Sequence, residues 1–174
     1  MERSQLEHVI RAAAGITGAD QFVIIGSQTI LGQFPNAPRE LLLSIEADIF
    51  TFRNPGDADL IDGSIGEGSP FHQTFGYYAH GVGPETAVLP LGWKDRLIPV
   101  RNENTGGGTG LCLEVHDLAC SKLAAGREKD LSFVGALLRH DLAKSQVIEQ
   151  RLDSMPLAEE RRARCLASLK RIMK

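Results

Sequence analysis

The sequence predicts an α+β fold in which a mixed β-sheet with flanking helices is followed by a helical C-terminal third. Short apolar runs bounded by glycine and proline occupy the first two-thirds of the chain, and helical spacing dominates the rest. The length of 174 residues is typical of one domain, and 43% hydrophobic and 24% charged residues are ordinary for a globular protein. We therefore expect a single domain over 1–174, with a sheet core over about 1–115 and helices over about 116–174.

Periodicity assigns the elements in the first part of the chain. At the N-terminus apolar residues recur three and four positions apart, as they do on one face of a helix, whereas further on β-branched residues form a short run. Over 41–52 polar and apolar side chains alternate, which is strand periodicity with Ser44, Glu46 and Asp48 on one face. The expected elements are helices over 3–14, 28–32 and 57–65 and strands over 22–25 and 41–52.

Turn-forming residues divide the remainder of the chain. The glycine-rich run 106–110 lacks the Gly-Lys-Ser/Thr ending of a phosphate-binding P-loop, and we interpret it as a flexible hairpin loop. Pro156 suits the first turn of the last helix, with Asp153 or Ser154 as its cap. The expected elements are strands over 75–82, 86–89, 95–101 and 111–115 and helices over 117–125, 127–139, 141–153 and 156–173.

Charge and cysteine content exclude several classes of protein. Nineteen basic residues against 22 acidic ones give a net charge of −3, which excludes a nucleic-acid-binding module that relies on bulk positive charge. The three cysteines form no CxxC pair and no zinc-type cluster, and their odd number favours reduced thiols. No stretch approaches the roughly 18 apolar residues of a membrane helix. We therefore expect a cytoplasmic protein without a membrane partner.

Glu46 and Asp48 form the most informative local feature. Two carboxylates at positions i and i+2 of a strand project from the same face, where they repel each other unless a cation lies between them. Hard oxygen ligands at this spacing suit Mg²⁺ or Mn²⁺, which bind one or two carboxylates together with substrate phosphates. The alternative interpretation is a solvated strand face that binds nothing.

A second feature lies upstream, where the strand over 22–25 ends at Gly26 and Ser27. Backbone N–H groups at such a turn bind anions such as phosphate, and the serine hydroxyl adds one more hydrogen bond. A strand, a Gly-Ser turn, a short helix and a second strand with two acidic residues one position apart form a pattern that resembles the nucleotidyltransferase superfamily.

The segment 114–134, EVHDLACSKLAAGREKDLSFV, narrows this resemblance. It is similar to the DLxxxKLxAxRxKDxxFV block of the minimal nucleotidyltransferases, which include AbiEii-type toxins and related small bacterial proteins. The resemblance covers about residues 20–140. It implies a nucleotidyltransferase-like sheet and the transfer of a nucleoside monophosphate from an NTP to an acceptor hydroxyl, with Mg²⁺.

The resemblance implies roles for the residues that match its first two blocks. Gly26 and Ser27 would hold the NTP phosphates, and Glu46 and Asp48 would bind the metal ion.

In the third block, Lys122 would neutralise the triphosphate where negative charge shifts to the leaving pyrophosphate, and Arg127 would assist it. Asp130 would be a catalytic or orienting acid. The competing structural interpretation is that Asp117 caps a helix and that residues 127–130 form a solvated charged surface.

Many members of the superfamily carry a third carboxylate on a following strand, as a base or a second metal ligand. At the matching place the strand over 75–82 offers His80, and a histidine serves as a general base near neutral pH. Glu114 is the substitute acid that the sequence offers. The alternative is a site that has lost its catalytic activity.

These observations predict a metal-dependent nucleotidyltransferase that modifies an RNA end or a protein hydroxyl, and the toxin-like resemblance slightly favours RNA. That resemblance also implies a toxin–antitoxin relation and an antitoxin-type protein partner. The alternative function is a catalytically degenerate module that binds a nucleotide or a protein partner on the same fold. The basic residues near the C-terminus form a solvated face or, alternatively, a surface for an RNA acceptor. They are Arg151, Arg161, Arg162, Arg164, Lys170, Arg171 and Lys174.

Overall fold

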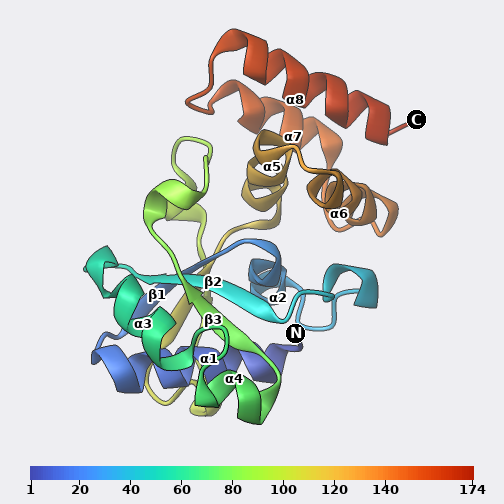
Figure 1. Ribbon diagram of the computed structural model, residues 1–174. Coiled ribbons are helices and arrows are strands. Elements are labelled where there is room, and N and C mark those ends of the chain that lie inside the picture. The colour runs from blue at the N-terminus through green and yellow to red at the C-terminus, as the bar shows by residue number, and fades with distance from the viewer.

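The computed structural model describes residues 1–174 and contains a five-stranded mixed sheet (Figure 1). The strands are β1 (Gln21–Ile25), β2 (Glu46–Thr51), β3 (Tyr78–Gly81), β4 (Ile98–Val100) and β5 (Thr109–Cys112), in the order β3-β2-β1-β5-β4. The central strand β1 pairs antiparallel with β2 and parallel with β5. At the two edges of the sheet, β3 pairs parallel with β2, and β4 pairs antiparallel with β5. The prediction of an α+β fold with a mixed sheet is confirmed.

The chain also forms eight α-helices. They are α1 (Arg3–Thr17), α2 (Ile30–Gln33), α3 (Ala58–Ile65), α4 (Pro70–Phe75), α5 (Val115–Ala125), α6 (Glu128–Arg139), α7 (Ser145–Asp153) and α8 (Glu159–Ile172). Helices α1, α3 and α4 lie on one side of the sheet, and α5 to α8 gather on the other (Figure 1). One cluster of 41 buried apolar residues runs from α1 through the sheet to α8, so the two parts share a continuous core. None of the helices combines the length and apolar character needed to cross a bilayer.

The burial pattern of β2 explains why its acidic side chains face one way. Ala47 and Ile49 are fully buried, whereas Glu46 and Asp48 are only partly buried and point to the opposite face. Burying an isoleucine side chain stabilises a fold by roughly 1.5–3 kcal/mol. A slip of one residue would expose these apolar groups and drive two carboxylates into the core, so the register of β2 is strongly specified.

Some predicted elements differ from the observed ones. The expected strand over 86–89 does not form, because Pro84–Thr86 adopt a 3-10 turn and no strand pairs with the residues after it. Helix α4 was not predicted, although Ser69-Pro70 is a helix-start signal, and the Ser69 hydroxyl accepts a hydrogen bond from the His72 N–H at 3.2 Å. The predicted hairpin loop over 106–110 does connect the antiparallel strands β4 and β5, but β5 already begins at Thr109.

The ends of several elements also shift. Strand β2 begins only at Glu46, since residues 39–41 form a 3-10 turn and residues 42–45 have no regular structure. Helix α8 begins at Glu159 with Ala158 as its N-cap, so the predicted cap at Asp153 or Ser154 is wrong. The turn that contains Pro156 lies between α7 and α8 and belongs to neither helix.

Candidate functional site

A cleft of about 1130 Å³ lies between the β2–β3 edge of the sheet and helices α5 and α6. Its walls include residues far apart in the sequence, from the turn after β1 to the last turn of α6. Seven of the eight predicted site residues line it, namely Gly26, Ser27, Glu46, Asp48, His80, Lys122 and Arg127. The eighth, Asp130, is fully buried behind the cleft wall.

Each carboxylate of β2 receives a partner from β3. The parallel register places Glu46 opposite Tyr78 and Asp48 opposite His80. The Tyr78 hydroxyl donates to Glu46 Oε2 at 2.8 Å, and His80 Nδ1 lies 3.1 Å from Asp48 Oδ1. Potential ligand atoms of Glu46, Asp48 and His80 all lie within 4.8 Å of one another. The two carboxylates are oxygen ligands that fit a divalent cation such as Mg²⁺ or Mn²⁺, and the imidazole of His80 lies beside them.

The electrostatics of the acidic pair favour a cation as well. Burial raises the pKa of Asp48, and the neighbouring negative charge of Glu46 raises it further. Burial also raises the pKa of Tyr78, as does its hydrogen bond to Glu46, so Tyr78 keeps the proton that it donates. A positive ion between the two carboxylates would offset the repulsion between their negative charges.

Gly26 brings the turn after β1 close to the acidic pair. Its backbone angles, φ 70° and ψ −165°, belong to a region that is essentially restricted to glycine. A Cβ atom at this position would lie 2.3 Å from Asp48 Oδ2, which is well inside van der Waals contact. The backbone of the turn therefore approaches Asp48 as closely as only glycine permits, and Ser27 follows directly at the cleft wall.

Lys122 and Asp130 form a buried charged pair behind Ser27. Lys122 Nζ donates to Ser27 Oγ and to Asp130 Oδ1, both at 2.9 Å. Arg127 adds Nε to Asp130 Oδ2 at 2.5 Å, and Asp130 itself is 0% exposed. Burial alone would raise the pKa of Asp130, but the hydrogen bonds and charges of its two cationic partners hold that pKa below its usual value. The interpretation of residues 127–130 as a solvated surface is therefore wrong for Asp130.

Glu114 does not join the acidic pair. It caps α5 by accepting from the His116 N–H, it bonds His116 Nδ1 at 2.7 Å, and it forms an ion pair with Arg151. Although burial would raise its pKa, the His116 hydrogen bond and the charges of His116 and Arg151 hold the pKa of Glu114 at about 2. Asp117, expected as a helix cap, is instead buried and paired with Arg96 and Arg151. Glu114 is thus not the substitute acid that the sequence offered.

Sequence reasoning missed several residues of the cleft. Tyr78 lies two positions before His80 and therefore points to the same face of its strand. Its place beside Glu46 can be predicted only if the pairing of this strand with β2 is known. On the opposite wall Lys129 adds to the charge of Lys122 and Arg127, whereas Arg139 is paired with Glu40 at 2.8 Å. Lys122 Nζ lies 5.1 Å from the ring centre of Phe133. The cleft therefore has an acidic wall on the sheet and a cationic wall on α5 and α6.

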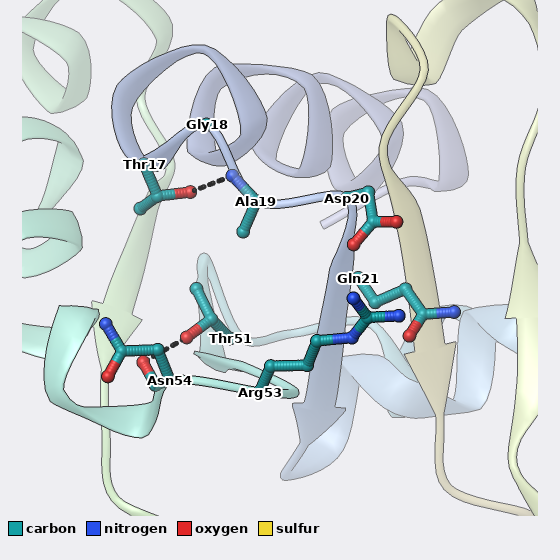
Figure 2. A pocket seen from close by; sticks show the side chains of 8 residues that line it. All are labelled: Thr17, Gly18, Ala19, Asp20, Gln21, Thr51, Arg53 and Asn54. Carbon is teal, nitrogen blue, oxygen red and sulfur yellow. Dashed lines mark hydrogen bonds between the residues drawn. The ribbon is translucent and has the colours of Figure 1, made fainter.

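A smaller hollow of about 270 Å³ lies at the other end of β1, where β1 begins and β2 ends (Figure 2). Two of its hydroxyl groups bond the backbone of their own turns. The Ala19 N–H donates to Thr17 Oγ1 at 3.1 Å, and the Thr51 hydroxyl donates to the Asn54 carbonyl. It contains none of the predicted site residues.

Comparison with known proteins identifies a family to which the chain belongs. The family model described as "Nucleotidyltransferase of unknown function (DUF6036)" matches residues 4–168, which include both walls of the cleft. No curated protein and no solved structure matches the chain significantly.

Proposed function

Since the chain belongs to the DUF6036 family of nucleotidyltransferases, we propose that its large cleft transfers a nucleoside monophosphate from an NTP to an acceptor hydroxyl. The observation that carries this proposal is the meeting of an acidic wall and a cationic wall across one cleft. A triphosphate carries several negative charges, and it is compatible with the acidic wall only when a divalent cation accompanies it.

In this proposal Glu46 and Asp48 hold Mg²⁺ or Mn²⁺, an ion that supplies charge neutralisation for phosphate oxygens. Ser27 and Lys122 bind the phosphates on the opposite side. The ammonium group of Lys122 faces the negative charge that accumulates on the leaving pyrophosphate. Asp130 touches no substrate and instead orients Lys122, because it is fully buried and accepts a hydrogen bond from Lys122 Nζ.

His80 is the proposed proton acceptor. Its Nδ1 contacts Asp48, which leaves Nε2 free, and half of its side chain is exposed to the cleft. The acceptor oxygen forms a bond to the α-phosphorus as the bond from that phosphorus to the bridging oxygen of the β-phosphate breaks. The hydroxyl proton passes to His80 Nε2, and pyrophosphate leaves.

An RNA end is the acceptor that we propose. Arg127, whose side chain is 62% exposed, and Lys129 lie at the cleft and would meet RNA phosphates. A protein hydroxyl is the alternative acceptor. The toxin–antitoxin relation and an antitoxin-type partner rest on the resemblance of the 114–134 block and belong to the proposal on that ground alone.

A second candidate function is a degenerate module that binds a nucleotide or a protein partner without catalysis. The observation that favours it is His80, which stands where many nucleotidyltransferases have a third carboxylate. Both candidates predict a nucleotide-binding cleft if the degenerate module retains the acidic pair. They differ in whether the nucleotide is transferred.

Calorimetric titration of each NTP with Mg²⁺ or Mn²⁺ tests the site, in the wild type and in the double variant Glu46→Ala, Asp48→Ala. We expect metal-dependent binding that the double variant loses. The matched control is Asp59→Ala, Asp62→Ala, which removes the same charge from the exposed face of α3 and should bind as the wild type does. Equal binding by the wild type and the cleft variant would refute the proposed site.

Labelled NTP then distinguishes the two functions. Transfer of label to RNA or protein supports the transferase, and we expect His80→Ala to reduce it by about 10²–10⁴-fold, as is typical when a general base is removed. Metal-dependent binding without transfer to RNA or protein supports the degenerate module.

A further inference from the structure

Tyr78 is the residue of the cleft to which the sequence pattern assigned no role. It is 8% exposed, and its hydroxyl donates to Glu46 Oε2 at 2.8 Å. The contact is a consequence of the fold, because the parallel register sets Tyr78 directly opposite Glu46 on the same face of the sheet. The hydroxyl is thus fixed at one end of the acidic pair by the backbones of two adjacent strands.

The carboxylate of Glu46 needs such a partner more than that of Asp48 does. A glutamate side chain has one more rotatable bond than an aspartate, so a metal ion must restrict more freedom to bind it. The backbone of Glu46 is already held, since its N–H donates to Ser44 Oγ at 3.2 Å. Only the side chain remains to be ordered, and Tyr78 is the hydrogen-bond donor that orders it. The bond occupies Oε2 and leaves Oε1 without a hydrogen-bond partner in the cleft.

The ring of Tyr78 packs against the first turn of α4. The His72 ring lies 4.7 Å from the Tyr78 ring, centre to centre. His72 is itself fixed, because its Nδ1 accepts from the Gly68 N–H at 3.0 Å and its backbone N–H donates to Ser69 Oγ. The position of the Tyr78 ring is therefore fixed, and so is that of its hydroxyl, as is required of a group that orients a metal ligand.

We propose that Tyr78 is a positioning residue that orients the Glu46 carboxylate for the divalent cation, an inference that rests on the metal site of the proposed function. Hydrogen-bond partners behind a metal ligand typically change metal affinity by 10–100-fold when they are removed. Tyr78 acts through Glu46 and is not itself a ligand, because its oxygen is engaged with Oε2.

The test is the affinity for Mn²⁺ alone, measured by calorimetry or by the paramagnetic signal of free Mn²⁺. Tyr78→Phe removes only the hydroxyl and keeps the ring that packs on His72. Tyr77→Phe is the matched control, because the neighbouring Tyr77 hydroxyl is also held in a side-chain hydrogen bond, to His8 Nδ1 at 2.7 Å, but Tyr77 does not line the cleft. Thermal unfolding of both variants measures the purely structural effect of losing one hydroxyl.

We expect Tyr78→Phe to bind Mn²⁺ about 10-fold or more weakly, and Tyr77→Phe to bind it as the wild type does. Glu46→Gln separates this inference from the proposed function. If Glu46→Gln loses Mn²⁺ binding and Tyr78→Phe does not, the role of Tyr78 is refuted and the metal site stands. If the wild type binds Mn²⁺ no better than Glu46→Gln, the metal site and the role of Tyr78 are both refuted.

Discussion

Replacing Gly26 by alanine tests the closest approach in the cleft. The backbone at this position has φ 70° and ψ −165°, and an alanine held in such a region is destabilised by about 1–3 kcal/mol. The added Cβ would also lie 2.3 Å from Asp48 Oδ2, so the Asp48 side chain must rotate away from it. Gly26→Ala should therefore lower stability and displace one of the two proposed metal ligands.

The expected loss of stability corresponds to a fall in Tm of roughly 2–12 °C for a chain of this length. Differential scanning calorimetry measures the Tm, and titration with Mn²⁺ measures the affinity, which we expect to fall at least as far as in Asp48→Ala. Gly18→Ala is the matched control. Gly18 also has a positive φ of 70°, but a Cβ there would meet no atom within 4 Å. The control should lose stability and keep its metal affinity.

The comparison of the two glycine variants separates backbone strain from the contact with Asp48. If Gly26→Ala kept the wild-type affinity for Mn²⁺, Asp48 would not be a metal ligand or the turn would not lie against it. If it kept the wild-type Tm as well, the conformation of the turn described above would be wrong.

Three further predictions concern buried groups. Asp130→Ala leaves its two cationic partners without their buried counter-charge, so we expect a loss of roughly 3 kcal/mol in chemical denaturation and weaker NTP binding; wild-type stability would contradict its burial. The pKa of Glu114 is about 2, below the usual 4.5, so its contribution to stability is fully present above pH 4.5 and is lost as the pH falls toward 2. Glu114→Gln should remove up to roughly 3 kcal/mol of acid dependence from the unfolding free energy in that range, and an unchanged profile would refute the low pKa. The three cysteines are buried, and burial raises their thiol pKa values, that of Cys112 to about 12, so a thiol reagent should label them only on unfolding; rapid labelling of the native protein would contradict this.

Local periodicity was sufficient to predict that Glu46 and Asp48 lie on one face of a strand and form the acidic wall. The alternation around Ala47 and Ile49 identified a strand with both carboxylates on one face, because burial of apolar side chains at every second position is a property of the segment itself. Gly26 was predicted on similar grounds, since an abrupt end of a β-branched run at glycine indicates a sharp turn. These predictions needed no knowledge of tertiary contacts.

The partners of those residues could not be predicted in the same way. Tyr78 meets Glu46 because β3 pairs with β2 in a parallel register, and the 26 residues between the two strands do not specify that register locally. The sequence around Asp130 does indicate that this residue is buried. Phe133, Val134 and Leu137 follow it three, four and seven positions later and are buried, so Asp130 lies on the apolar face of α6.

The buried ion pairs of Asp117 have a consequence for how a substrate reaches the cleft. Asp117 joins Arg96, in the connection before β4, to Arg151 on α7, and its own side chain is inaccessible to water. A hinge that swung the helices away from the connection before β4 would separate Arg96 from the buried carboxylate of Asp117, which is costly because it removes one of the two partners of a buried charge. This ion pair therefore resists opening of the cleft by such a hinge, whereas exposed side chains at the cleft such as Lys129 change rotamer in picoseconds to nanoseconds.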